Sequence, residues 1–128
     1  MYEEVINKYK DLLDKLLNSQ TYTLEELNND FKKNKLNSKH NVPGVYIIFE
    51  ENNNIVYAGR TTSKCIIDRV GNQHIYGGAS SDLRDLVGRP PVSEILKYKC
   101  KYLEIRNNIE RSRFEHFLIS VLNPKLNK

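Results

Sequence analysis

Four side chains in the C-terminal two thirds of the chain are of the types that act on phosphate groups. Tyr46 and Tyr57 lie in two short apolar runs, Arg69 follows in an amphipathic stretch, and Glu115 lies in the last such stretch. A tyrosine hydroxyl can orient a water or pass a proton, and an arginine fork can donate two parallel hydrogen bonds to a phosphate. A carboxylate is a hard oxygen ligand that suits Mg²⁺. These groups match the needs of metal-assisted phosphodiester hydrolysis.

A β-hairpin is predicted to position the two tyrosines. Val, Ile, Phe and Tyr dominate residues 44–50 and 55–60, and the asparagines between them supply a turn. A turn with an even number of residues makes Tyr46 and Tyr57 diagonal neighbours on one face, whereas an odd number puts them on opposite faces. If the hairpin is considered alone, the simpler interpretation is that both tyrosines are core residues.

Arg69 is predicted to lie at the edge of the apolar face of a helix that begins after Thr62 or Ser63. Gly71 is expected to end or weaken this helix, because glycine suits the left-handed position after a helix. His74 follows three residues later. Either the turn after Gly71 carries His74 toward Arg69, or the histidine plays no part in a site.

Two further elements complete the predicted domain. Strict alternation predicts a third strand near 98–105, with lysines on one face that are either solvated or form a basic stripe for nucleic acid: Lys97, Lys99 and Lys101. The last helix has an apolar face that includes Phe114 and Leu118. Glu115 lies about 100° of rotation from Phe114, where it is either a surface charge or a carboxylate in a cleft.

Residues 1–42 are predicted to form a helical arm and linker, with a domain at 43–128. The arm contains an amphipathic helix at 2–18 with a leucine stripe, and a second helix capped by Thr23 and Glu26. The stripe either packs on the domain or binds a partner, including a second copy of the chain. The predicted fold class is α+β: a small three-stranded antiparallel sheet flanked by helices.

Composition narrows the class of protein. The 128 residues include no apolar run of the roughly 20 residues that cross a bilayer and no apparent signal peptide, so we expect a cytoplasmic protein that does not enter membranes.

Cys65 and Cys100 are expected to be free thiols. The net charge of +4 arises entirely within residues 43–128, which suits a polyanionic partner.

The order of these features resembles the GIY-YIG nuclease family. Gly44-Val45-Tyr46 and Tyr57-Ala58-Gly59 correspond to its two tyrosine motifs, and Arg69 follows in a helix. The segments Phe114–Ile119 and Asn123–Asn127 are similar to the family's closing helix and its P-x-x-N ending. The resemblance covers residues 43–127.

The resemblance implies a role for each matching residue. Tyr46 would be a general base or orient the water, Tyr57 would hold the water and phosphate network, and Arg69 would contact the scissile phosphate. Glu115 would be the single protein ligand of Mg²⁺ or Mn²⁺. The resemblance also implies a histidine one helical turn after the arginine, but Gln73 occupies that spacing here and His74 lies one residue later, so His74 is an uncertain catalytic match. The remaining assignments are a phosphate contact for Arg60 and a structural or supporting role for Asn127.

The implied function is a metal-dependent endonuclease that hydrolyses DNA. Two alternatives stay open: a module that keeps the fold and binds nucleic acid with impaired catalysis, which the displaced His74 favours, and a protein that binds a partner through the leucine stripe.

We expect DNA binding to weaken as salt rises, because each phosphate contact releases a counterion and contributes roughly −0.9 to the slope of log K against log salt. Changing Lys97, Lys99 and Lys101 together to alanine should flatten the slope if the lysine face touches DNA. Fluorescence anisotropy from low to physiological salt measures this slope. A flat dependence in the wild type would contradict a surface that follows the phosphate backbone.

Overall fold

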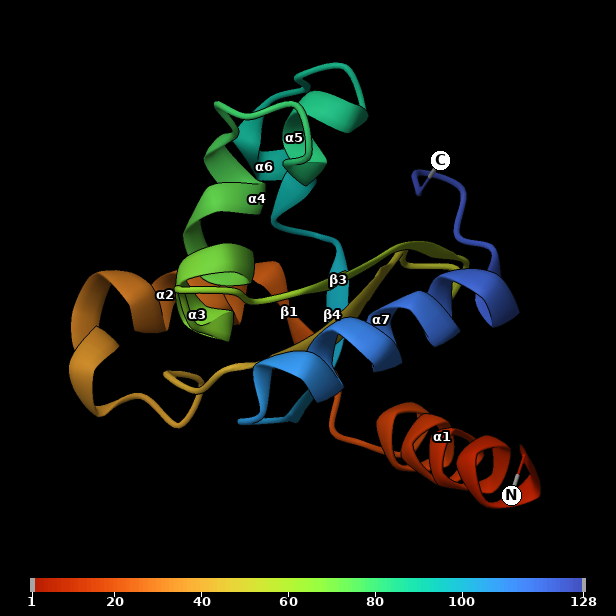
Figure 1. The fold of residues 1–128 in the computed structure, drawn as a ribbon. Helices are drawn as coiled ribbons and strands as arrows, with labels where there is room; N and C mark the ends of the chain where they lie inside the picture. The colour runs from red at the N-terminus through yellow and green to blue at the C-terminus, as the bar shows by residue number, and fades with distance from the viewer. Residues whose placement is uncertain (1, 128) are drawn as a thin grey trace.

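The computed structural model describes residues 2–127, which fold around a four-stranded antiparallel sheet in the order β1-β4-β2-β3. Helices cover both faces of this sheet (Figure 1). The strands are β1 (Tyr22–Thr23), β2 (Gly44–Phe49), β3 (Ile55–Arg60) and β4 (Lys99–Glu104). The predicted α+β class is confirmed. The sheet has one strand more than predicted, because β1 pairs with β4 through Tyr22 and Cys100.

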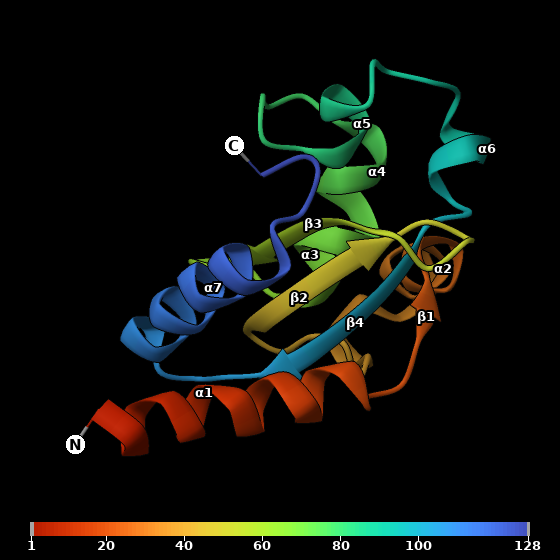
Figure 2. The same cartoon turned by 90° about the vertical axis from the view of Figure 1, so that its right-hand side faces the viewer.

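Two helices lie on one face of the sheet and shorter helical elements lie on the other (Figure 2). The first layer consists of α1 (Tyr2–Leu17) and α7 (Asn108–Leu122). The second consists of α2 (Leu24–Asn34), α3 (Ile66–Asp68), η2 (Arg69–Gln73), α4 (His74–Tyr76), α5 (Leu83–Leu86) and α6 (Val92–Ile95). A short 3₁₀ turn, η1 (Lys35–Asn37), follows α2. None of the helices among the described residues combines the length and hydropathy that a membrane-spanning segment needs.

The β2–β3 hairpin has the register expected of an even turn, but it reaches it differently: the paired residues Phe49 and Ile55 enclose a five-residue loop, and a β-bulge between Ile48 and Phe49 offsets this odd number. Tyr46 lies opposite Gly59, and Ile48 lies opposite Tyr57. Alternation along the strands then divides the apolar residues between two cores. Tyr46 and Ile48 face the core under α2 and α3, whereas Val45, Ile47 and Phe49 face α1 and α7. The two tyrosines therefore lie on the same side of the sheet, as the family spacing requires.

Residues 2–42 pack against the rest of the described structure, which is one of the two alternatives that the sequence left open for the arm. Thr23 caps α2 and forms the predicted capping box with Glu26. Leu24 and Leu27 are fully buried in one core, and Leu16 is fully buried in the other. The leucine stripe that the sequence left open for a partner instead packs against this chain's own sheet and α7.

Gly71 does not end the helix that carries Arg69. The helical segment continues through a five-residue π turn, η2, to Tyr76 and stops before Gly77. Glycine is required at position 71 because a Cβ there would lie 2.8 Å from the carbonyl oxygen of Leu27 in α2. The residue thus serves the close approach of two helices rather than a helix end.

Asn28 of α2 connects to the same segment at two points. Its amide nitrogen donates to the carbonyl oxygen of Gly71 at 2.8 Å, and its amide oxygen accepts from the hydroxyl of Tyr76 at 3.2 Å. The side chain is buried, so its removal would leave the Gly71 carbonyl without this donor in a place that water does not reach.

Both cysteines are free, as expected, and Cys100 is buried.

We expect Asn28→Ala to lower the free energy of unfolding by about 1–3 kcal/mol, since a buried acceptor loses its donor. The neighbouring Asn29 is exposed, so Asn29→Ala should change stability by less than about 0.5 kcal/mol. Urea denaturation of both variants measures the difference. Equal effects of the two substitutions would show that α2 does not hold the π turn through Asn28.

Candidate active site

The two tyrosines are brought together on the sheet by a glycine. Their ring centroids lie 6.3 Å apart. A Cβ on Gly59 would lie 2.7 Å from the Tyr46 hydroxyl and 2.8 Å from the ring of Tyr57. Gly59 therefore provides the space that lets both rings lie over the end of β3. This is the physical reason for glycine two residues after the second tyrosine.

The π turn brings His74 beside Arg69. The backbone N–H of His74 donates to the carbonyl oxygen of Arg69, five residues earlier. In an α-helix the residue four positions after Arg69 would share its face, but a π turn shifts this position to the fifth. His74 is fully buried, and its Nε2 lies 2.6 Å from the hydroxyl oxygen of Tyr46. Of the two alternatives left by the sequence, the structure places the histidine next to the tyrosines.

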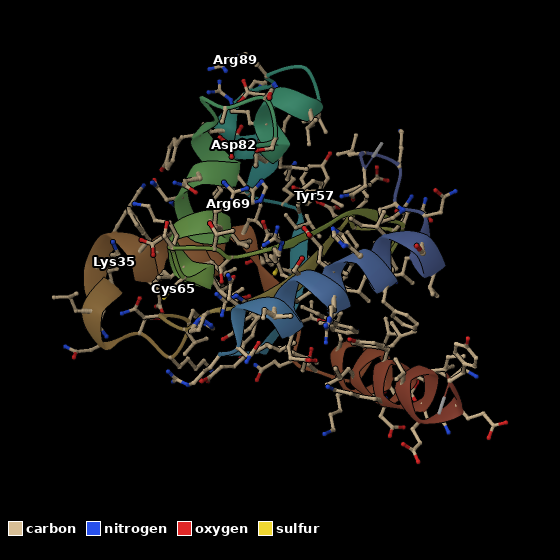
Figure 3. All side chains as sticks on the ribbon, viewed as in Figure 1. Lys35, Tyr57, Cys65, Arg69, Asp82 and Arg89 are labelled. Atoms are coloured by element: carbon tan, nitrogen blue, oxygen red, sulfur yellow. The ribbon has the colours of Figure 1, made fainter. Side chains whose placement is uncertain are left out.

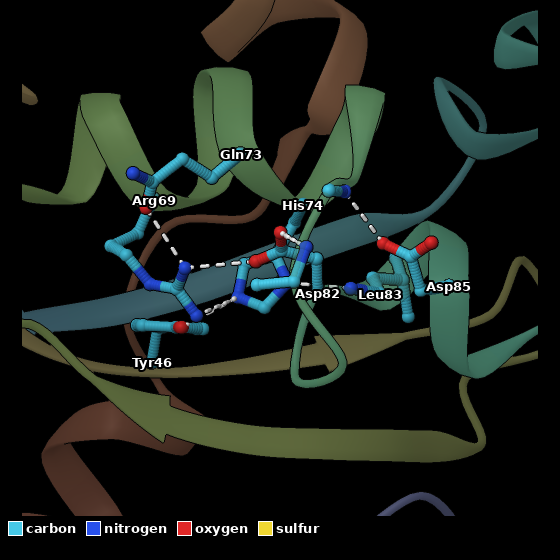
Figure 4. Close-up of polar contacts among 9 residues, drawn as sticks. Tyr46, Arg69, Gln73, His74, Asp82, Leu83 and Asp85 are labelled. Carbon is cyan, nitrogen blue, oxygen red and sulfur yellow. Dashed lines mark hydrogen bonds and ion pairs between the residues drawn. The ribbon is translucent and has the colours of Figure 1, made fainter.

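Arg69 is held by two neighbours. Its Nη1 lies 2.9 Å from Asp82 Oδ1 and 2.8 Å from Gln73 Oε1 (Figure 4). Gln73, which occupies the spacing expected for the histidine, therefore supports the arginine. Arg69 extends from the helical segment and Tyr57 from β3 (Figure 3). The guanidinium can thus present its remaining N–H groups next to the tyrosines.

Burial controls the protonation of this cluster. Burial and the adjacent Arg69 lower the pKa of His74 well below its usual value, so the imidazole is neutral at pH 7. Burial raises the pKa of Tyr46, although the charge of Arg69 opposes the shift. Burial also raises the pKa of Tyr57 against the effect of Arg69, and the negative charges of Glu115 and Asp82 raise it further. Both hydroxyls are therefore protonated in the resting site.

Glu115 reaches the site from the opposite layer. It lies on α7 and forms an ion pair with Arg60 of β3, in which its Oε1 accepts a hydrogen bond from Arg60 Nε at 3.0 Å. Because β3 is at the edge of the sheet, groups from both layers meet around it. Arg60 lies three residues after Tyr57 in the same strand, so its ion pair with Glu115 anchors the carboxylate to the strand that carries Tyr57.

A buried arginine fixes the register of α7. Arg111 lies one turn before Glu115 and donates to the carbonyl oxygens of Thr61, Thr62, Ile105 and Arg106. These bonds connect the start of α7 to the loop that leaves β3. They set where Glu115 lies relative to Arg60.

Asn127 completes the edge of the sheet. Its side-chain oxygen accepts from the N–H of Ala58 and its amide donates to the carbonyl oxygen of Ala58, both at 2.8 Å. The amide therefore acts like one residue of a neighbouring strand between Tyr57 and Gly59. Asn127 is placed to hold β3 and does not contact the Tyr46 hydroxyl. This geometry agrees with the structural role implied by the resemblance.

The predicted lysine stripe does not lie beside the tyrosines. Lys99 and Lys101 pair with Phe49 and Ile47, so they share the face of the sheet opposite Tyr46. Lys101 donates to the carbonyl oxygen of Leu17 at the end of α1, at 2.6 Å. Lys97 lies before β4 begins. Because α1 covers part of this face, the three lysines do not form one continuous exposed stripe, and their contact with nucleic acid stays a prediction.

Asp82 and Arg111 were not found from the sequence. Each lies in an unremarkable polar stretch, and its importance comes from contacts with residues distant in the chain. Burial is the signal that distinguishes them, since both charged side chains are almost inaccessible to solvent. Buried charges are rare unless they are paired, but a single sequence does not reveal which charges are buried.

The model of the GIY-YIG catalytic domain matches residues 42–127. The chain belongs to the GIY-YIG family. Among solved structures, it is similar to the GIY-YIG N-terminal endonuclease domain of UvrC from Thermotoga maritima bound to magnesium. The TM-score is 0.52 and the sequence identity is 21%, and the match covers 77% of this chain and 97% of that one. The chain is also similar to a tyrosine-to-phenylalanine mutant of that domain bound to its catalytic divalent cation. For this mutant the TM-score is 0.52 and the sequence identity is 22%, and the match covers 77% of this chain and 96% of the other. Comparison with curated protein sequences gives no match.

The two halves of the GIY-YIG motif lie at the start of β2 and near the end of β3. Gly44-Val45-Tyr46 and Tyr57-Ala58-Gly59 lie side by side in the sheet, with Tyr46 directly opposite Gly59. The family match begins at residue 42, but β1 and α2 lie before that point and contribute to the same sheet and core. This GIY-YIG domain is therefore extended at its N-terminus by elements that pack beneath the site.

We expect the stability of the protein to fall as the pH drops below about 6.5, because unfolded His74 then takes up a proton that the folded state resists. The effect is absent well above pH 6.5 and reaches about 1.4 kcal/mol per pH unit for one proton. His74→Gln should flatten the dependence of the unfolding free energy on pH between pH 7 and 5. The remaining slope would include His40, whose pKa is also lowered by burial.

His116 is the matched control because it is exposed on α7. His116→Gln should leave the pH dependence of urea denaturation unchanged. If His74→Gln has the same slope as wild type, His74 is not held neutral by the fold.

Proposed function

We propose that the protein is a metal-dependent endonuclease that hydrolyses phosphodiester bonds of DNA. The observation that carries the proposal is the position of Tyr57 on the edge strand. Its ring centroid lies 6.3 Å from that of Tyr46 and 5.2 Å from that of His74, which is adjacent to Arg69 in one layer. Arg60, three residues later in the same strand, pairs with Glu115 of the other layer at 3.0 Å. A phosphate at this edge could therefore meet an arginine, two tyrosines and a metal-binding carboxylate together.

Glu115 is the residue proposed to bind Mg²⁺ or Mn²⁺. Groups of three or more His, Cys, Asp or Glu side chains that could hold a metal do not occur within residues 2–127. A single carboxylate nevertheless fits Mg²⁺, which keeps several waters and is commonly bound through one or two carboxylates and the substrate phosphate. The similar UvrC domain is described as bound to magnesium, its catalytic divalent cation. Bound metal would supply Lewis-acid stabilisation of the phosphate and a more acidic water.

The other side chains have separate proposed tasks. Arg69 would donate to the scissile phosphate, because Asp82 and Gln73 fix one end of its guanidinium and leave other N–H groups available. Tyr57, which is only partly buried, would orient the water and phosphate network. Tyr46 would act on the attacking water, with His74 as its hydrogen-bond partner. Arg60 would neutralise Glu115 before metal binds and contact phosphate afterwards.

The alternative of a catalytically impaired binding module loses its main support from the sequence. That alternative rested on a histidine one residue out of place. The π turn places this histidine 2.6 Å from Tyr46, so its spacing no longer favours a damaged site.

We expect Glu115→Gln to reduce Mg²⁺-dependent cleavage by about a hundredfold or more, because metal binding contributes several kcal/mol to the stabilisation of such transition states. DNA affinity without metal should hold or rise, since a negative charge near phosphate is removed. Plasmid nicking as a function of Mg²⁺ concentration and calorimetric titration with Mn²⁺ measure the two effects.

Glu110→Gln is the matched control. It makes the same chemical change on α7 at a carboxylate that pairs with Lys8, away from β3. This variant should cleave at nearly the wild-type rate. If Glu115→Gln cleaves equally well with an unchanged Mg²⁺ midpoint, Glu115 is an ordinary surface carboxylate.

A further inference from the structure

Two neighbouring residues after α4 contact two different side chains of the site. Asp82 Oδ1 accepts from Arg69 Nη1 at 2.9 Å, and the backbone N–H of Leu83 donates to His74 Nδ1 at 2.8 Å (Figure 4). Neither residue belongs to the tyrosine motifs. The segment that contains them therefore contacts the site through Arg69 and His74.

The contact from Leu83 determines which nitrogen of His74 carries the proton. A backbone N–H can only donate, so Nδ1 must present its lone pair. A neutral imidazole with an unprotonated Nδ1 has its proton on Nε2. Nε2 lies 2.6 Å from the hydroxyl oxygen of Tyr46. The hydrogen bond between these residues therefore runs from His74 to Tyr46.

This direction leaves the proton of the Tyr46 hydroxyl for another acceptor. His74 cannot accept it, because Nδ1 is occupied by Leu83 and Nε2 is protonated. Arg69 cannot accept it either, because a guanidinium has only donors. Its Nη2 is 3.3 Å from His74 Nε2, which is close contact between two donors rather than a hydrogen bond. The hydrogen bonds among the described residues therefore give the Tyr46 proton no acceptor, and an oxygen of a phosphate or water would have to supply one.

Asp82 is fixed well enough to orient Arg69. Its side chain is only 4% exposed, and its second oxygen accepts from the N–H of Ala79 at 3.0 Å. The carboxylate is therefore held by its own turn while the first oxygen receives Arg69. Because the guanidinium is planar, fixing Nη1 by Asp82 and Gln73 also limits the directions of its other N–H groups.

We propose that Asp82 and the Leu83 N–H are positioning groups of this active site. Asp82 sets the orientation of Arg69, and the Leu83 N–H sets His74 in the Nε2–H tautomer. Tyr46 is thereby made a hydrogen-bond donor to the substrate phosphate or the attacking water. The identity of that acceptor rests on the proposed function, whereas the tautomer does not.

The first test uses the wild-type protein labelled with ¹⁵N in histidine, without DNA or metal. We expect the ring of His74 to give a pyrrole-type ¹⁵N shift for Nε2 and a pyridine-type shift for Nδ1 near pH 7. Spectra of His40→Gln and His116→Gln assign the remaining signals. The opposite tautomer or a fully protonated ring would overturn the proposal. This result is independent of whether the protein cleaves DNA, so it fails separately from the proposed function.

The second test removes the N–H of Leu83. Leu83 is the first residue of α5, where proline is tolerated, and Asp82 before it has the extended ψ of 142° that proline requires. Leu83→Ala is the matched control, since it also shortens the buried side chain but keeps the N–H. We expect Leu83→Pro to lose the single Nε2–H signature and to cleave about tenfold more slowly than Leu83→Ala. Equal rates and the same tautomer in both variants would overturn the role of Leu83.

The third test compares two aspartates of the same region. Asp82→Asn should reduce kcat about tenfold, because Arg69 loses a charge-assisted hydrogen bond. Asp85→Asn makes the same change at a carboxylate that contacts Gly78 and Arg89 instead, and should retain kcat within about twofold. Asp82→Glu, which restores the charge, should recover part of the loss. Equal kcat for Asp82→Asn and Asp85→Asn would overturn the role of Asp82.

Discussion

The position of His74 beside Arg69 depends on one extra residue in the helical turn that joins them. In a continuous α-helix, Gln73 would lie over Arg69 and His74 would be rotated by about 100° away from Tyr46. The i to i+5 hydrogen bond from His74 to Arg69 removes that rotation. A π turn has less favourable geometry than an α-helix, so it requires support from outside. That support comes from α2, through the Leu27 carbonyl packed on Gly71 and the two hydrogen bonds of Asn28.

The edge of the sheet imposes a second constraint. Tyr57 and Arg60 lie on an edge strand, where groups from both layers can meet, yet an exposed edge strand invites pairing with other chains. The C-terminal tail resolves this conflict. The N–H of Leu126 donates to the carbonyl oxygen of Val56, and Asn127 occupies both backbone groups of Ala58. The edge is thereby partly closed, while the tyrosine beside it stays accessible.

Local patterns were sufficient to predict much of the fold. The alternation of apolar residues and the asparagine turn predicted both strands of the hairpin. The register with Tyr46 opposite Gly59 is the one expected of an even turn, but a β-bulge between Ile48 and Phe49 and a five-residue loop produce it. The Thr23–Glu26 capping box and the last helix were likewise read from short spacings. The predictions that were wrong concerned features that depend on contacts between residues distant in the chain. Gly71 is required by its close contact with α2, and β1 forms because it pairs with the free edge of β4. Lys101 donates a hydrogen bond to the end of α1. A π turn also leaves no distinct residue pattern, so His74 could be read in two ways.

The two arginine–carboxylate pairs on either side of Tyr57 differ in a way that suits different tasks. In the Arg69–Asp82 pair the side chains are 18% and 4% exposed, and hydrogen bonds hold both partners from several sides. Separating this pair would leave a buried charge without its partner, which is strongly unfavourable. In the Arg60–Glu115 pair the side chains are 29% and 15% exposed, and a single contact joins them. Water can solvate both groups when this pair opens, so a cation or a phosphate can compete for its members at lower cost. If Glu115 is the metal ligand, the site therefore combines a fixed phosphate-binding arginine with an exchangeable ion pair that metal replaces.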